Sequence, residues 1–198
     1  VIAHRLMGHW QPTGDYFRQL LSSDTADADI SRPYPFYLAY ALEDGPTSLG
    51  DVGDWQVEWK WDGIRGQIVK RQGEGFIWTR GEELVTGKYP EISRDAAQLP
   101  DGTVIDGEIL AWREYRERAS EARLGVNDVL DPMDIPVYAW RDGRPLLFSE
   151  LQRRIGRKTV GQKLLSEVPV SLLAYDLLEH GGRDVRGRPL DWRRARLV

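Results

Sequence analysis

The stretch from residue 64 to residue 80 constrains the fold of this chain more than any other. It holds two runs rich in β-branched and aromatic residues, IRGQIVKR and GFIWTR, which are joined through the glycine-containing QGEG. Two such runs with glycines between them predict a β-hairpin, because glycine reaches the backbone angles of tight turns without steric cost. The chain is therefore expected to contain an antiparallel sheet.

Three further stretches predict strands. WQVEWKW at 55–61 alternates strictly, so a strand there places its tryptophans on one face and Glu58, Lys60 and Asp62 on the other. GTVIDGEILAW at 102–112 predicts a strand with Asp106 and Glu108 on a common face. VPVSLLAYDLLE is apolar on both faces, which predicts a strand in the centre of the sheet.

The other segments predict short helices and connections. Helices are expected at 12–22, from Pro90 onward, and in SELQRRIG, which begins with a serine and ends with a glycine. The prolines and aromatic residues of RPYPFYLAYAL predict an extended segment laid on a core. Residues 113–136 mix charges with turn residues and predict an insertion, and the residues after 180 predict a turn and the start of a helix.

Composition excludes several classes of function. The 198 residues, 41% of them hydrophobic, suffice for a single core, and the absence of cysteine removes disulfides, thiolate zinc sites and cysteine nucleophiles. The three histidines, His4, His9 and His180, have no metal-site spacing. No run reaches the roughly eighteen apolar residues of a membrane helix, and no signal pattern opens the chain. The cytoplasm is the expected location.

The charge of the chain is uneven. The formal net charge is −4, so a nucleic-acid partner has to be argued from local patches. The stretch 183–196 holds six arginines against Asp184 and Asp191, and 151–163 is a second, weaker basic cluster. Taken alone, either patch also fits a solvated helix face, which is the more common case.

Lys60 is the first candidate for chemistry. A lysine between acids on a strand also fits a ladder of solvated charges on the outer side of a sheet. That ladder does not explain Gly63, which indicates a close backbone approach, or Arg65 and Arg80, two permanent cations on the adjacent hairpin. Near cations or a metal, a lysine amine loses its proton more readily and attacks phosphorus or carbonyl centres. From these residues alone both interpretations stand.

Four motifs in order carry a resemblance to a known family. KWDGIR, the arginine after the hairpin, DGEILAW and LLAYDLLEHGGRDVRGRPLDWRR resemble the covalent nucleotidyltransferases, which include ATP-dependent DNA ligases, RNA ligases and mRNA capping enzymes. The set is most similar to the nucleotidyltransferase (adenylation) domain of bacterial ATP-dependent DNA ligases. The resemblance implies an α+β, ATP-grasp-like fold of two mainly antiparallel sheets with flanking helices, and a nucleotide between the sheets.

The resemblance also implies a domain organisation. Residues 1–31 resemble a linker at the end of an upstream DNA-binding domain, and residues 32–198 the nucleotidyltransferase domain. The family's last motifs and its OB-fold domain are absent from the sequence. The chain as given is therefore expected to bind ATP poorly and to seal no nicks by itself.

The resemblance implies a role for each matched residue. Lys60 attacks the α-phosphate of ATP and holds AMP as a phosphoramidate, while Glu58 lies beside the adenine and Tyr175 stacks on it. Glu108 holds the ribose hydroxyl or a metal, and Asp62 contacts metal or sugar or supports the motif. Arg65 and Arg80 engage the DNA nick as well as the nucleotide, with Arg80 at the 5′-phosphate. The implied metal ligands are Glu108 and Asp62.

The implied reaction transfers AMP from Lys60 to the 5′-phosphate of nicked double-stranded DNA, after which the 3′-hydroxyl displaces AMP. ATP and Mg²⁺ are the expected cofactors, and a monomer acting in DNA repair, recombination or replication is the expected setting. An RNA ligase, a capping-type nucleotidyltransferase and a non-catalytic DNA-binding module remain alternatives. Each residue also has a structural alternative: Glu108 as a strand charge, Tyr175 as a core aromatic, and Arg80 as a partner of Glu82 or Glu83.

Overall fold

The computed structural model describes residues 12–21, 30–113, 144–157 and 159–197. The insertion expected at 113–136 and most of the linker expected at 1–31 fall outside these residues. The described helices are α2 (Gly14–Leu21), α3 (Pro90–Ala96), α4 (Phe148–Ile155), α5 (Gln162–Glu167) and α6 (Leu190–Arg194), with 3₁₀ turns η1 (Pro46–Leu49), η2 (Val52–Asp54) and η3 (Thr86–Lys88). The strands are β1 (Ile64–Arg71), β2 (Glu74–Thr79), β3 (Thr103–Arg113), β4 (Arg144–Pro145), β5 (Val170–His180) and β6 (Arg183–Asp184).

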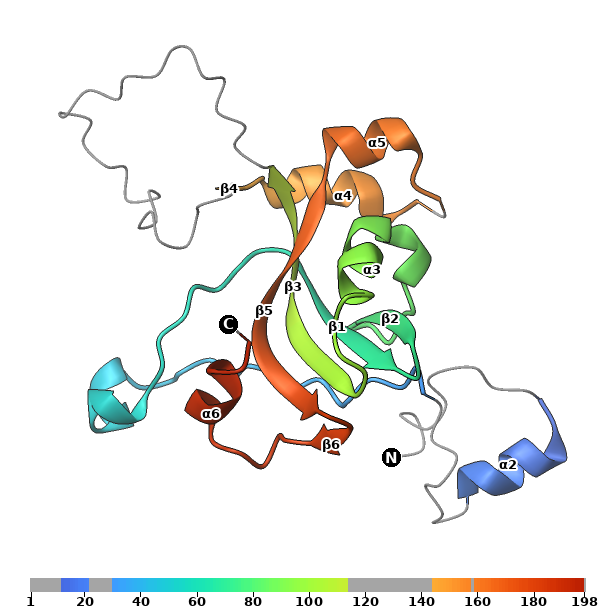
Figure 1. Cartoon of the computed structure of the whole chain (residues 1–198). Helices are drawn as coiled ribbons and strands as arrows, with labels where there is room; N and C mark the ends of the chain where they lie inside the picture. Colours follow the sequence, from blue (N-terminus) through green and yellow to red (C-terminus); the bar gives the residue numbers. More distant parts are fainter. Residues whose placement is uncertain (1–11, 22–29, 114–143, 158, 198) are drawn as a thin grey trace, which may run out of the picture.

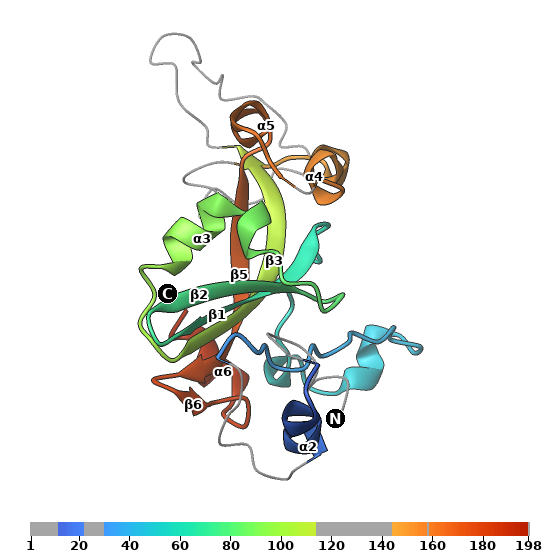
Figure 2. The same cartoon turned by 90° about the vertical axis from the view of Figure 1, so that its right-hand side faces the viewer.

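The strands form one antiparallel sheet in the part of the chain that the structure describes. Its order is β2-β1-β3-β5-β6, and the short β4 pairs with the end of β3. The sheet bends strongly, so that β1 and β2 run across the long β3 and β5 (Figure 2). The expected α+β class with antiparallel strands is confirmed. The central strand is β3, whereas β5, expected to be central, has only the two-residue β6 on its outer side.

The predicted hairpin forms with a two-residue turn. Arg71 pairs with Glu74, which leaves Gln72 and Gly73 at the turn with positive φ of 52° and 79°. Two consecutive positive φ values match the twist of the flanking strands. Glycine adopts this geometry without strain at the second position.

The sheet is covered on both faces. One face carries the larger core, where Ile77, Ile109 and Leu151 pack with residues of α3 and α4. The opposite face carries a smaller core around Val69 and Trp78, against which the extended residues Ile30, Tyr34 and Phe36 pack. The aromatic, proline-containing segment from residue 32 thus begins on a core as predicted, and its residues from 37 onward are exposed.

Polar contacts fasten that extended segment to the sheet. The fully buried Gln67 amide accepts a 2.8 Å bond from Tyr34 N–H and donates a 3.0 Å bond to its carbonyl, as a neighbouring strand would. Trp78 Nε1 donates to the Ser31 carbonyl at 2.6 Å. Arg71 donates to the carbonyls of Ile30 and Arg32 and forms an ion pair with the buried Glu179. This face of the sheet is therefore a fixed platform.

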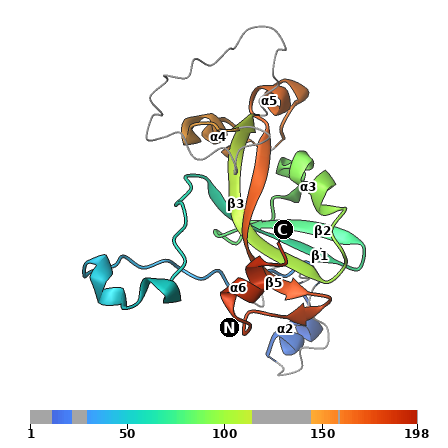
Figure 3. The ribbon, with the colours of Figure 1, turned by 60° about the vertical axis from the view of Figure 1, so that its left-hand side comes forward.

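The strand predicted at 55–61 does not form. Residues 55–62 belong to no strand, and the segment 43–62 extends away from the sheet (Figures 1 and 3). The apolar side chains of this alternating stretch have no core to pack against: Val57 is 89% exposed and Trp59 is 61% exposed. Because no strand forms, a cross-strand ladder of charges does not account for Lys60.

The sequence predicts α2, α3, α4 and α6, with boundaries that differ by a few residues, and it does not predict α5. α3 begins at Pro90 as predicted, because a proline at the first helical position loses no hydrogen bond. α4 begins at Phe148, one residue before the expected serine, and no side chain caps it. Among the described residues no helix is long and apolar enough to cross a membrane.

Candidate active site

A cavity of about 960 Å³ lies where the extended segment 58–63, the start of β1, the end of the β1–β2 hairpin, β3 and β5 approach one another. Residues 37–39 form part of its wall, and Lys88, Tyr89 and Ile155 close another side. The structure brings every residue singled out in the sequence to this cavity: Glu58, Lys60, Asp62, Arg65, Arg80, Glu108 and Tyr175.

Gly63 positions the lysine-bearing segment against the sheet. A Cβ atom at Gly63 would lie 2.3 Å from the Ile109 carbonyl and 2.7 Å from Leu110 Cδ2, so no larger residue fits. The close approach expected from the sequence is therefore made by β3 itself. Lys60 lies three residues earlier, is exposed, and forms no ion pair with any carboxylate of the described residues.

Arg65 is held in one orientation on the cavity wall. Its Nη2 and Nε donate to the two oxygens of Asp106 at 2.9 and 3.3 Å, and its Nη1 donates to the Tyr37 carbonyl. The guanidinium also lies over the rings of Phe36 and Tyr175, at 5.6 and 5.9 Å from their centroids. Burial disfavours the charged form, but the hydrogen bonds to Asp106 and the negative charges of Asp106 and Glu108 together raise the pKa of Arg65.

The two carboxyl groups of β3 differ in their surroundings. Asp106 is almost fully buried, and burial raises its pKa although Arg65 acts in the opposite direction. Glu108 faces the cavity, and burial raises its pKa as well, against the Gly63 amide and the cations of Arg65 and Lys60. Glu108 of β3 lies directly opposite Arg65 of β1 in the sheet register. It is thus the partly desolvated carboxyl group within electrostatic reach of Lys60.

Arg80, like Lys60, is a cation of the cavity that forms no ion pair with the described carboxylates. Its backbone N–H donates to the Arg65 carbonyl at 3.0 Å, so both arginines are fixed on one hairpin. Glu83, an alternative partner expected from the sequence, instead binds Lys88 at 2.6 Å. Among the described residues no carboxylate forms an ion pair with Arg80, and its side chain is exposed. A planar guanidinium in this state suits a phosphate.

Tyr175 and Glu58 lie on different walls. Tyr175 comes from β5 and is partly buried, and burial together with the nearby Asp106 carboxylate raises the pKa of its hydroxyl. Its ring lines the cavity instead of the core, which leaves a face for a planar ligand. Glu58 reaches the cavity from the extended segment and forms an ion pair with Arg194 of α6.

The residues present fit a magnesium ion that is held mainly by phosphate. Glu108 and Asp62 are two carboxylates lining one cavity. Mg²⁺ commonly keeps its waters and takes one or two protein carboxylates beside the phosphates of a nucleotide. Across the described ranges no three histidine or acidic side chains gather into a site that would hold a metal by themselves.

Sequence reasoning missed three contributors to the site. Asp106 was placed on the strand but not recognised as the anchor of Arg65, although it lies two residues from Glu108 in DGE. The Tyr37 carbonyl and Lys88 were missed because both come from stretches without a charge pattern. For Asp106 the available signal was an acid buried in an otherwise apolar strand, which requires a charged partner.

Comparison with known proteins gives a consistent result. Residues 38–126 match the family model described as the ATP dependent DNA ligase domain. A probable DNA ligase of Opitutus terrae is 34% identical over 171 residues, which are 86% of this chain and 14% of that protein. A probable DNA ligase of Koribacter versatilis is 32% identical over 87% of this chain and 25% of that protein.

The chain spans only a small part of such relatives: it covers 14% of the Opitutus terrae protein and 28% of a probable DNA ligase of Streptomyces coelicolor. Among solved structures, the ligase domain of LigD from M. tuberculosis aligns with a TM-score of 0.45 and 27% identity, over 71% of this chain and 34% of that one.

Proposed function

We propose that this chain is the nucleotidyltransferase part of an ATP-dependent DNA ligase, because its residues 38–126 match the ATP dependent DNA ligase domain model. One observation carries the proposal. Residues from four separated stretches, with Lys60 among them, line a single cavity that also holds two arginines and four carboxylates. This combination suits the transfer of a phosphoryl group, in which fixed cations stabilise charge on phosphate oxygens.

In the first step Lys60 Nζ attacks the α-phosphorus of ATP. A phosphorus–nitrogen bond forms, the bond to the β-phosphate oxygen breaks, pyrophosphate leaves, and the amine gives up a proton to solvent. Tyr175 offers its ring to the adenine, Glu58 contacts the base, and Glu108 contacts the ribose. Arg65 is already fixed by Asp106, so it orients the nucleotide without rearrangement.

In the second step an oxygen of the DNA 5′-phosphate attacks the same phosphorus. The phosphorus–nitrogen bond breaks and Lys60 takes back a proton. In the third step the 3′-hydroxyl attacks the 5′-phosphate, loses its proton, and releases AMP as the strand is sealed. The unpaired Arg80 is suited to hold the 5′-phosphate, and Arg65 contributes its charge beside it.

A magnesium ion held by Glu108, Asp62 and phosphate oxygens would supply charge neutralisation. The protein groups then determine orientation. Glu108 fits this role only when ionised, and its raised pKa means that it ionises at a higher pH than an ordinary glutamate.

The finer expectations from the resemblance belong to the same proposal. They comprise a linker at 1–31, the domain at 32–198, and an ATP-grasp-like second sheet across the nucleotide. The uncovered apolar side chains Tyr40, Val57 and Trp59 support that second layer, because it would shield them from water. Cytoplasmic location, a monomeric state and a role in repair, recombination or replication complete the proposal.

The test is intact-protein mass spectrometry of the full-length protein that carries this sequence, after incubation with Mg²⁺ and either ATP or GTP. We expect a gain of one AMP with ATP alone. Lys60→Arg keeps the positive charge but removes the nucleophile, so the gain should disappear. Lys163→Ala is the matched control, because Lys163 is 89% exposed and lies outside the cavity.

Other outcomes contradict the proposal in distinguishable ways. A gain with GTP instead points to capping-type chemistry, and transfer of AMP to nicked RNA but not to nicked DNA points to an RNA ligase. No gain with either nucleotide, in a protein that folds, leaves a non-catalytic DNA-binding module.

A further inference from the structure

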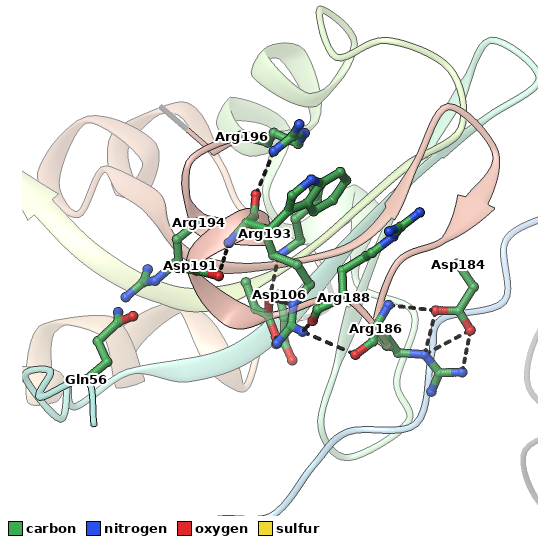
Figure 4. Close-up of polar contacts among 12 residues, drawn as sticks. Gln56, Asp106, Asp184, Arg186, Arg188, Asp191, Arg193, Arg194 and Arg196 are labelled. Carbon is green, nitrogen blue, oxygen red and sulfur yellow. Dashed lines mark hydrogen bonds and ion pairs between the residues drawn. The ribbon is translucent and has the colours of Figure 1, made fainter. Parts of the chain in front are cut away.

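The basic stretch 183–196 resolves into two kinds of arginine. Three are paired with carboxylates: Arg186 binds Asp184 at 2.8 Å, Arg193 binds Asp176 at 2.7 Å, and Arg194 binds Glu58. Figure 4 shows Arg186 turned onto Asp184, and Arg194 directed from α6 toward Gln56. The other three are exposed and, within the described ranges, form no ion pair: Arg183, Arg188 and Arg196.

Two of the unpaired arginines share one aromatic ring. Arg196 lies 3.6 Å from the centroid of the Trp192 indole, and Arg188 lies 5.7 Å from it. Arg196 also donates through Nη1 to the Trp192 carbonyl at 2.9 Å. We call Arg188, Trp192 and Arg196 the α6 surface.

The base of the α6 surface is fixed. Trp192 packs against the larger core and meets the His180 ring edge-on, with centroids 6.4 Å apart. Below it, Arg193 ties α6 to β5 through Asp176 and donates to the carbonyls of Arg186 and Arg188. The two guanidiniums therefore stand on a rigid support, which reduces the side-chain entropy lost when they bind a ligand.

The nearest acid does not neutralise these charges. Asp191 lies in the same helix, but its Oδ1 accepts a 2.6 Å bond from the Trp192 N–H. Two like charges over one ring repel each other, and an anion that binds both relieves the repulsion. Guanidiniums with free edges bind phosphate oxygens in pairs of hydrogen bonds.

The helix that carries Trp192 borders the cavity. Arg194 of the same helix contacts Glu58, which lines the cavity, so α6 forms its neighbour on one side. A duplex whose nick lies at Arg80 would extend beyond the cavity, because B-DNA carries its phosphates along about 3.4 Å of axis per base pair. A second set of cations beside the cavity is suited to that flanking duplex.

We propose that the α6 surface binds the phosphate backbone of duplex DNA beside the nick, through Arg188 and Arg196 stacked on Trp192. The contact is independent of base sequence, because guanidiniums over an indole read charge and spacing and not base edges. This inference rests on the proposed function for its partner.

The test measures binding of the full-length protein to a fluorescent nicked duplex by anisotropy, over a series of KCl concentrations. Arg188→Ala/Arg196→Ala should weaken binding and make the slope of log affinity against log salt shallower by about 2, at roughly 0.9 per phosphate contact. Arg94→Ala/Arg153→Ala is the matched control, because it removes two exposed arginines from α3 and α4. α4 lies at the opposite end of β5 from α6 (Figures 1 and 3). The control should keep the original slope.

An unchanged slope in Arg188→Ala/Arg196→Ala, or an equal loss in the control, overturns the inference. The inference is also overturned if the double variant binds a fluorescent hairpin RNA more weakly than the unmodified protein does but binds duplex DNA equally well. The proposed function is tested separately, by the gain of AMP mass when the unmodified protein is incubated with ATP. A protein that adenylates but keeps its salt slope in the double variant retains its function and loses this surface.

Discussion

The cavity joins two regions that are built differently. On the sheet, Arg65, Glu108 and Tyr175 stand on strands that are buried on both faces and cross-linked by ion pairs. On the extended segment, Glu58, Lys60 and Asp62 belong to no strand. Two valines mark the contrast, because Val69 of β1 is 0% exposed and Val57 is 89% exposed.

The difference indicates that the sheet and the extended segment would have different roles in the proposed reaction. Arg65, Glu108 and Tyr175, which would bind and orient a nucleotide, are fixed before it arrives, which keeps the cost of ordering them out of the binding step. The residue that would attack the phosphorus lies on the part of the site that is least held by packing. A nucleophile that must approach ATP, carry AMP and then present it to DNA benefits from a backbone with few fixed contacts.

The largest expected effect comes from a substitution in α4, one of the helices that cover the sheet region. The Arg154 side chain is 0% exposed, binds both oxygens of Glu91, and donates to the carbonyls of Lys88 and Val168. Arg154→Ala should lower the free energy of unfolding by about 3–5 kcal/mol, because it leaves a carboxylate without its buried partner. Chemical denaturation measures the loss. The neighbouring Arg153→Ala should cost far less, because the ion pairs of Arg153 are exposed to solvent, and equal losses would contradict the assignment.

A matched pair of substitutions sharpens the comparison directly. Val69→Ala should cost about 2–3 kcal/mol, from lost burial and a residual cavity, whereas Val57→Ala should change stability by less than about 0.5 kcal/mol. Both are measured by the same denaturation curve. A cost for Val57→Ala near that of Val69→Ala would show that the extended segment is packed in solution.

The junction of the two regions is the third target. Gly63→Ala places a methyl group against the Ile109 carbonyl and should cost about 2 kcal/mol. It should also slow adenylation in the mass-spectrometric assay, because the chain after Lys60 must shift. Gly156→Ala is the control, since Gly156 has φ of −78° and open space around its Cβ position. Its stability should hold or rise slightly.

The smallest effect concerns the protonation of Glu108. Its pKa is raised in the folded state, so above the ordinary value of 4.5 the folded protein holds a proton that the unfolded chain has lost. Stability from this group is present at low pH and is lost as the pH rises through the raised pKa. Glu108→Gln mimics the neutral form and should stabilise the protein at pH 7 by less than about 1 kcal/mol, because the group is partly solvated.

That gain should shrink as the pH is lowered toward 4.5, which denaturation curves at several pH values measure. A gain that stays constant with pH would mean that the carboxyl group is not responsible. Adenylation should fall in the same variant, because the amide cannot replace a carboxylate that holds metal or ribose.

The sequence predicted the sheet region well and the extended segment poorly. The β1–β2 hairpin and the β3 strand follow from alternation and turn glycines, which act over a few residues. WQVEWKW carries the same alternation, but a strand also needs a partner, and a sequence pattern does not say whether one lies alongside. For the same reason the apolar residues of β5 predict a central strand and do not reveal that only the two-residue β6 lies beyond it.

The candidate residues were found by their motifs, while their environment was not. The resemblance to the nucleotidyltransferases singled out Arg65 and Glu108, yet the pairing of Arg65 with Asp106 and its contact with the Tyr37 carbonyl depend on tertiary contacts. The distinction between paired and unpaired arginines in 183–196 likewise required the structure, because neighbouring acids in sequence bind only some of them.

The contact between Gly63 and the Ile109 carbonyl also sets a length. With Gly63 held against β3, the Cα atom of Lys60 lies at most about 10–11 Å from it, since an extended chain spans ~3.3–3.6 Å per residue. The proposed nucleophile, Lys60, thus lies on a short tether with a fixed attachment point. Each residue inserted between Lys60 and Gly63 would lengthen that tether by up to ~3.3–3.6 Å. It would thereby widen the region in which AMP could be delivered.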